Sequence, residues 1–358
     1  MTKRHTVLAP NSMNTNSWNR PANGSPEMTP VAPPTHMEMA NMTDTNFNPY
    51  QIVADLRGLY IKTPRDSQLR SQLDRLLQRN SAGQPTPRPV IFTKTGHDEG
   101  DTRGIVLVEG AGGGKTSLIH HVLSTHPALQ GDDPESLLWL GVRVPSPATT
   151  KSLGLEILRA TGYEEVSGSR KEWDIWKILR HRLRERGTVV LWIDEAHDLF
   201  RAGKQVEDIL RLLKSVMQGP GAVIMILSGV ESLWNIASHD DQVKRRYAKV
   251  TLPAVSVASH GDMFVRLMGK YCEKAELVPP PPSDLISRLV FASRGRFGRC
   301  IENIISAIET ALLRGDKQLT ADHFAEDWAI QEGAVPGKNV FLSPRWAEIE
   351  LAKVHVAA

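Results

Sequence analysis

A glycine-rich loop between a strand pattern and a helix pattern constrains the fold of this chain more than any other feature. The apolar run Gly104-Ile-Val-Leu-Val108 precedes the loop Glu109-Gly-Ala-Gly-Gly-Gly114, and a helical pattern begins at Lys115. Such a loop lets backbone N–H groups converge on phosphate oxygens, and the helix N-terminus adds the positive end of its dipole. The sequence therefore predicts a phosphate-binding turn at the end of a buried strand.

The residues of this loop predict an ATP site. We expect Lys115 to reach the β- and γ-phosphates and the Thr116 hydroxyl to bind Mg²⁺. Glu109 stands where the consensus G-x-x-x-x-G-K-[ST] has glycine, but the glycines that follow leave the loop enough backbone freedom to form. The alternative is a chance glycine turn before an amphipathic helix. The expected ATP-binding residues are Gly110, Ala111, Gly112, Gly113, Gly114, Lys115, Thr116 and Ser117.

Polar residues also end the later strand patterns. Asp194 and Glu195 follow an apolar run directly. Asp194 is expected beside the Mg²⁺ site, and Glu195 is expected to orient and polarise the attacking water. Ser228 either hydrogen-bonds the γ-phosphate or the water, or simply begins a Ser-Gly turn. We expect His197 and Asp198 at the surface, where a helix starts.

Apolar runs alternate with helical patterns through the middle of the chain. Such alternation predicts an α/β fold, with a parallel sheet covered by helices on both faces. After Pro253 the patterns are helical only, which predicts a small all-helical second domain. The predicted strands are 104–108, 137–144, 188–193, 222–227 and 248–252. The predicted helices after Pro253 are 259–275, 284–293, 297–314 and 320–330.

Composition shifts mark further boundaries. The first 48 residues are rich in Asn, Pro, Thr and Met and are predicted to be disordered. A proline-rich stretch at 81–89 is predicted to be a linker or loop, and the C-terminal tail holds one short amphipathic piece. The predicted division is a tail (1–48), a helical segment with linker (49–90), a nucleotide-binding domain (91–257), a helical domain (258–331) and a C-terminal tail (332–358).

Composition excludes several classes of protein. With 41% apolar and 23% charged residues, the chain is neither a collagen, nor a coiled-coil rod, nor wholly disordered. No apolar run approaches the roughly 20 residues of a membrane span. Cys272 and Cys300 form no disulfide framework, so a cytoplasmic location is expected. The net charge of +3 does not by itself indicate a nucleic-acid binder, although a basic stripe repeated along an oligomer would suffice.

Three basic clusters have open interpretations. Lys244-Arg245-Arg246-Tyr247 either supplies an arginine finger to a neighbouring subunit or is a solvated helix end. Arg296 and Arg299 open a helix, where the dipole disfavours cations, so phosphate or DNA is a plausible partner. The run Arg180-His-Arg-Leu-Arg-Glu-Arg186 is more often a solvated helix face than a DNA contact.

The order of these motifs resembles that of the AAA+ ATPases and, more specifically, of the TniB and TnsC group of transposition ATPases. The resemblance spans about residues 50–330. It rests on Leu59-Tyr-Ile61, Thr63-Pro-Arg65, Leu73-Asp-Arg-Leu-Leu77, the loop from Glu109 to Thr116, Ile193-Asp-Glu-Ala-His197, Asp240-Asp-Gln, Arg246-Tyr247 and Leu252-Pro253.

The resemblance implies an AAA+ sheet domain followed by a helical lid, and a regulator rather than the transposase itself. Such proteins bind ATP, form rings or filaments on double-stranded DNA, and recruit or activate a transposase, with hydrolysis controlling assembly. A target-selector protein is a further implied partner. Ser228 matches the sensor on the fourth strand and Arg246 the arginine finger, with Arg245 as its alternative. Either Arg296 or Arg299 matches the lid arginine.

Two other functions remain open at this level. One is a helicase or replication-loader type of AAA+ protein, which a winged-helix DNA reader after residue 330 would have favoured. The other is a nucleotide-gated scaffold that binds ATP with little turnover. A small-molecule kinase is a distant third, because no acceptor pocket can be argued from these residues.

Overall fold

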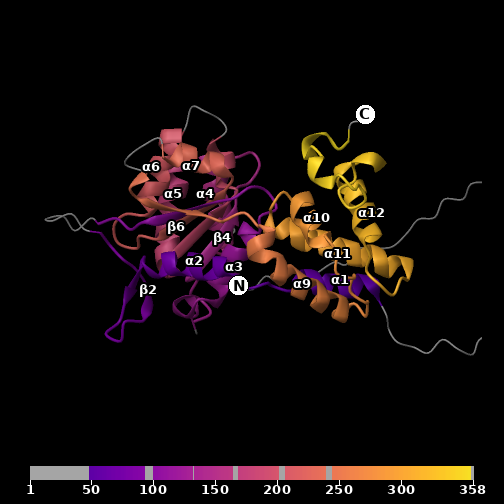
Figure 1. Ribbon diagram of the computed structural model, residues 1–358. Helices are drawn as coiled ribbons and strands as arrows, with labels where there is room; N and C mark the ends of the chain where they lie inside the picture. Colours follow the sequence, from indigo (N-terminus) through magenta and orange to yellow (C-terminus); the bar gives the residue numbers. More distant parts are fainter. Residues whose placement is uncertain are drawn as a thin grey trace, which may run out of the picture. The chain divides into compact units, whose positions relative to one another are not determined.

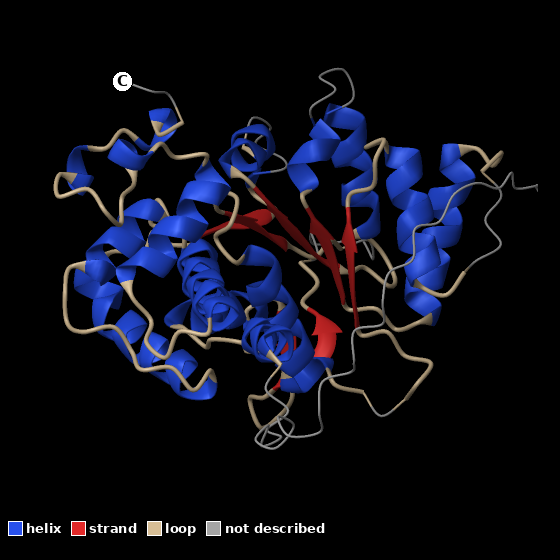
Figure 2. Cartoon of the chain, turned by 90° about the vertical axis from the view of Figure 1, so that its right-hand side faces the viewer, coloured by secondary structure: helices blue, strands red, loops and turns tan. Residues whose placement is uncertain are grey.

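Strand β3 (Gly104–Val108) lies inside a five-stranded parallel sheet in the order β4-β5-β6-β3-β7 (Figure 2). This computed structural model describes residues 48–92, 100–131, 133–163, 168–200, 206–238 and 244–355. All five predicted strands are confirmed, with ends that differ by one or two residues. The other four are β4 (Trp139–Arg143), β5 (Val190–Asp194), β6 (Ile224–Gly229) and β7 (Tyr247–Thr251).

Helices cover both faces of the sheet, as predicted, because successive strand residues point to opposite sides. Ile105 and Leu107 belong to one hydrophobic core, whereas Val106 and Val108 belong to the other. The first core includes α2 (Pro64–Asp74), α3 (Lys115–Thr125) and the short η1 (Pro127–Leu129). The second includes α4 (Thr150–Ala160), α5 (Glu172–Glu185), η2 (Ala196–Phe200), α6 (Val206–Val216) and α7 (Glu231–Ala237) (Figure 1).

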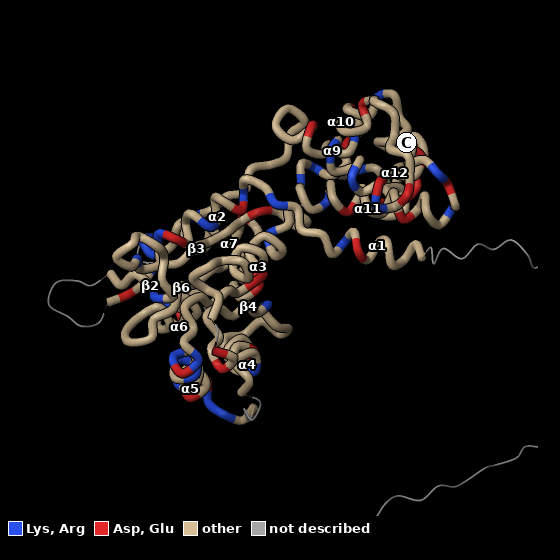
Figure 3. Tube along the Cα trace, turned by 90° about the horizontal axis from the view of Figure 1, so that it is seen from below, with Lys and Arg blue, Asp and Glu red and all other residues tan. Residues whose placement is uncertain are grey.

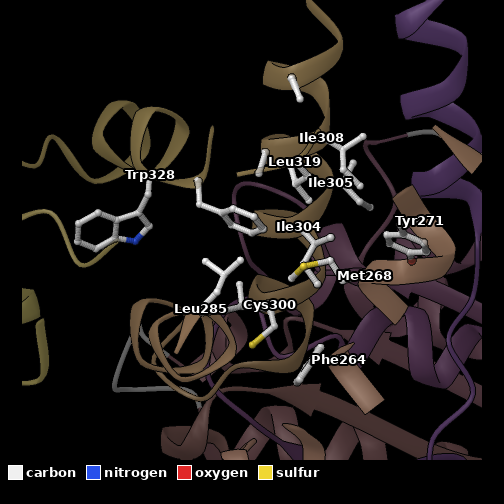
Figure 4. Packing of buried hydrophobic residues seen from close by; sticks show 14 of the residues in the cluster. Phe264, Met268, Tyr271, Leu285, Cys300, Ile304, Ile305, Ile308, Leu319 and Trp328 are labelled. Carbon is white, nitrogen blue, oxygen red and sulfur yellow. The ribbon is translucent and has the colours of Figure 1, made fainter. Parts of the chain in front are cut away.

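The predicted helices after Pro253 form a bundle with its own core. Figure 4 shows Phe264, Met268, Ile304 and Trp328 packed within it, and all four are buried. An isolated bridge between Val278 and Gln318 is the only β-pairing among the described residues of this part. The bundle helices are α9 (Val257–Lys274), α10 (Leu285–Ala292), α11 (Phe297–Arg314) and α12 (Ala321–Glu332).

The predicted helical segment 49–90 is shared between the two parts of the molecule. Helix α1 (Pro49–Gly58) buries Val53 and Leu56 in the bundle core and contacts α11. Helix α2 instead buries Leu69 and Leu73 in the sheet core. The short stretch between these helices therefore joins the bundle to the sheet.

The expectation of a linker or loop at 81–89 is wrong for its second half. Residues Pro85–Pro89 form β2, which pairs with β1 (Leu77–Arg79) in an antiparallel hairpin. The Asn80 side chain organises the turn by accepting hydrogen bonds from the backbone N–H groups of Ala82 and Gln84. Proline is tolerated here because a two-stranded ribbon leaves one side of each strand without ladder hydrogen bonds.

The expectation of a C-terminal tail is also wrong for residues 333–355. Val340, Phe341 and Val354 are buried in the bundle core, and the Asn339 amide donates a hydrogen bond to the Ala325 carbonyl at 2.7 Å. The predicted amphipathic piece is a pair of short 3₁₀ turns rather than one helix. The 3₁₀ turns of this segment are η3 (Pro336–Lys338), η4 (Trp346–Glu348) and η5 (Leu351–Lys353).

Two further predictions concern the N-terminal tail and membrane-spanning helices. The tail predicted to be disordered, 1–48, lies outside the described residues apart from Asn48, whose side chain caps α1. No helix within the described ranges is both long and apolar enough to cross a membrane.

The packing of the C-terminal segment predicts a stability effect. Phe341 is 4% exposed and packs against Phe324 and Trp328, so Phe341→Ala should cost about 3–5 kcal/mol of unfolding free energy. Leu342 is 52% exposed, and Leu342→Ala is the matched control, with an expected change under about 0.5 kcal/mol. Urea unfolding of the whole chain measures both. Equal, small effects would show that the segment is not part of the core.

Candidate nucleotide-binding site

The register of the parallel strands places Ser228 and Asp194 together at the carboxyl edge of the sheet, and the first turn of α3 adds Thr116. Ser228 pairs with Leu107 of β3, and Asp194 ends the neighbouring strand β5. The Ser228 hydroxyl donates to Asp194 Oδ1 at 2.6 Å, and the Thr116 hydroxyl donates to Asp194 Oδ2 at 2.8 Å. One carboxylate thus joins the first turn of α3 to two strands.

A buried indole fixes the direction of this hydrogen-bond chain. Trp192 Nε1 donates to Ser228 Oγ at 2.8 Å, so the hydroxyl proton is available to Asp194. Ser228 is fully buried inside β6 and does not begin a turn, which excludes the turn interpretation. Its hydroxyl contacts Asp194 and Trp192, so any influence on bound phosphate passes through Asp194.

Glu195 follows this cluster in an unusual backbone conformation. Its φ of 53° is rare for a residue with a side chain, and such strain clusters at functional sites. The side chain is 26% exposed, and its Oε2 atom lies 3.2 Å from Nδ1 of His197. The expectation of a surface position for His197 is wrong, because η2 folds back on the sheet and buries the imidazole.

The phosphate loop holds its lysine in place through backbone carbonyls. Lys115 is buried and donates from Nζ to the carbonyls of Glu109 at 3.0 Å and Gly110 at 3.3 Å. Thr116 and Ser117 are exposed on the first turn of α3. The loop therefore offers a cation and a hydroxyl at one helix N-terminus, as the sequence predicts.

The start of α11 lies directly on the loop. The Arg299 backbone N–H donates to the Gly112 carbonyl at 2.9 Å, and a Cβ atom on Gly298 would come within 2.7 Å of the same oxygen. A Cβ atom on Gly110 would overlap the Arg296 guanidinium. Arg299 also pairs with Glu332 at 3.2 Å. The structure brings both candidate lid arginines to the loop.

Glu109 is paired with a residue that the sequence did not single out for the site. Arg65 Nη1 lies 3.3 Å from Glu109 Oε1, and the two side chains are 7% and 5% exposed. Burial raises the pKa of the Glu109 carboxyl, and the Arg65 charge is the largest influence that lowers it. Two signals were present in the sequence: an acid at a glycine position, and an arginine within the Thr63-Pro-Arg65 motif.

A cavity of about 300 Å³ opens beside the loop. The stretch between α1 and α2 forms one wall, where the Tyr60 hydroxyl donates to Asp66 at 2.6 Å and its ring stacks on His121. Burial and the Asp66 carboxylate raise the Tyr60 pKa, so this hydroxyl keeps its proton. Residues lining the cavity include Tyr60, Ile61, Gly113, Ser117, Phe297 and Ile301.

Comparison with known proteins agrees with this geometry. Residues 95–257 match the family model of the bacterial TniB protein. The chain is similar to the solved structure of Cdc6p from Pyrobaculum aerophilum, with 16% identity, a TM-score of 0.54, and coverage of 76% of this chain and 69% of that chain. Residues 95–257 thus resemble the bacterial TniB protein, and the chain shares the fold of Cdc6p.

A second solved structure supports the same fold. It is the Aeropyrum pernix ORC1 protein in complex with DNA, with 17% identity, a TM-score of 0.55, and coverage of 78% of this chain and 69% of that chain. No curated protein matches the chain. The predicted AAA+ sheet with a helical lid is thus confirmed, and the bundle of α9 to α12 is that lid.

The oxygen donors beside the phosphate loop fit a Mg²⁺ ion. The Thr116 hydroxyl and the Asp194 carboxylate already share one hydrogen bond, and Mg²⁺ favours a few hard oxygen ligands together with nucleotide phosphates. The described residues hold no group of three or more His, Cys, Asp or Glu side chains that could form an all-protein metal cage.

Arg246 does not occupy the position expected of a finger in this structure. Its guanidinium is 9% exposed and pairs with Asp101, with Nη2 2.7 Å from the carboxylate. Arg245, the alternative, is exposed in the turn before β7. The physical reason is the ion pair with Asp101, which holds the Arg246 side chain inward, whereas Arg245 in the same turn stays exposed.

Proposed function

We propose that this protein is a Mg²⁺-dependent ATPase that binds double-stranded DNA, oligomerises on it, and recruits or activates a transposase with the help of a target-selector protein. The observation that carries the proposal is the Thr116–Asp194–Ser228 cluster beside the phosphate loop, with Glu195 next in the chain. The family match to the bacterial TniB protein supports the role in transposition.

The geometry gives each side chain a task in hydrolysis. The loop N–H groups and Lys115 bind the phosphates, and the base enters the neighbouring 300 Å³ cavity, whose apolar walls suit a purine ring. Thr116 and Asp194 hold the metal, which supplies charge stabilisation at the transferred phosphoryl group. Glu195 orients and polarises the attacking water, and Ser228 keeps Asp194 in place.

Oligomerisation is supported by the position of Arg245. Tyr247 pairs with Gly104 at the amino edge of the sheet, whereas the phosphate loop follows Val108 at the carboxyl edge. A strand of five residues separates these edges by roughly 17 Å. Arg245 therefore cannot serve the site of its own subunit, and it can act only on that of a neighbour in a head-to-tail assembly.

DNA binding is supported by the exposed face of α5. Lys177, Arg180, His181 and Arg184 follow one another at helical spacing, next to Trp173, which is 67% exposed. Figure 3 shows basic segments, in blue, together with acidic ones along α5. Such a face offers charges for phosphates and an aromatic ring, and repetition along an oligomer would multiply a few contacts. The similar ORC1 protein was solved with DNA, which favours the same ligand class.

Glu195→Gln should lower ATP turnover by about 10²–10⁴-fold and leave ATP binding intact, because the amide cannot act as a base. Steady-state phosphate release and equilibrium ATP binding measure the two effects. Glu207→Gln, at an exposed position on α6, is the matched control and should change neither. Undiminished turnover in Glu195→Gln would refute the assignment, and a wild-type protein that binds ATP with little turnover would favour the scaffold function.

Arg245→Ala should abolish turnover while each subunit still binds ATP, because the missing group belongs to the neighbour's site. Mixing Arg245→Ala with Glu195→Gln subunits should restore part of the activity, since some interfaces then combine an intact Glu195 with an intact Arg245. Arg246→Ala should not restore activity when it is mixed with Glu195→Gln subunits. It should instead lower the thermal unfolding temperature, because the Asp101 carboxylate loses its ion-pair partner. Complementation by Arg246→Ala would make Arg246 the finger.

Replacing Lys177 and Arg180 by alanine should weaken duplex DNA binding and reduce the slope of log affinity against log salt by about 2 per subunit. Removal of two charges elsewhere, by Arg211→Ala with Arg345→Ala, is the control and should leave the slope unchanged; both arginines are highly exposed. A salt titration by fluorescence anisotropy measures this. Equal slopes in the two double variants would exclude α5 as the DNA face.

A further inference from the structure

The ion pair between Arg65 and Glu109 is unusual because both partners are almost wholly buried. Their closest atoms are 3.3 Å apart, and each side chain is less than a tenth exposed. Burying one charge without its partner is strongly unfavourable, so each of these residues is tolerated largely because the other is present. The pair links helix α2 to the first residue of the phosphate loop, 44 positions later in the chain.

Arg65 is anchored on several elements at once. Beyond Glu109, it donates from Nη1 to the Gly113 carbonyl at 3.1 Å and from Nη2 to the Pro253 carbonyl at 2.6 Å. Its guanidinium carbon lies 5.3 Å from the centre of the Phe297 ring, within cation–π range. One side chain thus contacts both ends of the loop, Pro253 two residues after β7, and the first residue of lid helix α11.

An acidic residue in a phosphate loop creates an electrostatic conflict. The nucleotide brings several negative charges to the loop, and in this poorly solvated region the Glu109 carboxylate would repel them. Three cations face Glu109: Arg65 from α2, Lys115 from the loop, and Arg296 from the lid. Lys115 and Arg296 are the ones expected to engage phosphate, whereas Arg65 is held by the Gly113 and Pro253 carbonyls.

We infer that Arg65 is a positioning residue for ATP binding, which acts by neutralising Glu109 and holding its carboxylate against the loop. This inference rests on the proposed nucleotide site and adds to it a residue outside the loop. The chain tolerates glutamate in place of the consensus glycine because Arg65 supplies the compensating charge. Without Arg65, Glu109 opposes the phosphates, and without Glu109 the arginine charge is no longer required.

A double-mutant cycle on nucleotide affinity tests the inference. Arg65→Met should weaken binding of a slowly hydrolysed ATP analogue by about tenfold or more. Glu109→Gln alone should bind it within about threefold of wild type, and the Arg65→Met, Glu109→Gln double variant should recover to a similar level. Arg70→Met on the same helix is the matched control and should leave affinity unchanged. Isothermal titration calorimetry measures all five proteins as full chains.

A pH series separates charge compensation from a general loss of structure. In Arg65→Met, the largest influence that lowers the Glu109 pKa is gone, so the carboxyl takes up a proton more easily. Its affinity for the analogue should therefore improve as the pH falls, and the double variant should lack this gain. If Arg65→Met fails to fold, as judged by circular dichroism, recovery of folding and binding in the double variant still supports the inference.

The outcomes separate the two levels of the proposal. If the wild type binds no nucleotide, the proposed function fails. If the wild type binds and Arg65→Met binds equally well, the inference is overturned and the proposed function stands. If the folded double variant binds as weakly as Arg65→Met, the inference is likewise overturned, because Arg65 would then act by a route other than Glu109.

Discussion

Parallel hydrogen bonding of β3 to β6 on one side and β7 on the other is the constraint on which the rest of this structure depends. It brings the end of β3, where the loop starts, level with Ser228 on β6. Asp194 ends β5, on the far side of β6. The same register places Arg245 at the opposite edge, beside the start of β3. A parallel sheet thus sorts its polar residues by edge: those that end strands gather around the phosphates, and those that precede strands face elsewhere.

The loop is held from outside the sheet as firmly as from within it. The backbone of α11 contacts Gly112, and Arg65 joins Gly113 to Pro253 and to the Phe297 ring. Because α1 packs in the lid core and α2 in the sheet core, the stretch between them also spans both parts. A change in loop position upon nucleotide binding would therefore shift several contacts with the lid at once. Small shifts at a site become domain movements in this way.

Local patterns were sufficient to predict the strands, most helices and the Thr116–Asp194 pair, because each follows from alternation, loop composition and the rule that parallel strands end at one edge. Tertiary pairing was not predictable in this way. The sequence does not predict that Glu109 pairs with Arg65 or that Asp101 pairs with Arg246, because the tertiary fold determines which residues so distant in the chain come into contact. The sequence did not predict β2, because proline disfavours a strand, but pairing with β1 overrides this propensity. It did not predict the C-terminal turns as part of the core, but the burial of Phe341 places them there.

The net charge of +3 is better understood from the positions of the individual charges in the structure. Two buried arginines, Arg65 and Arg246, are each neutralised by a paired carboxylate, Glu109 and Asp101 respectively. The exposed cations to which the proposed function gives a role, those of α5 and Arg245, lie on separate parts of the sheet domain. In the proposed head-to-tail assembly, each neighbour would supply Arg245 to the next subunit's site and would extend the basic face of α5. DNA binding and ATP turnover would thus depend on the same assembly, and the monomer would be nearly silent in both.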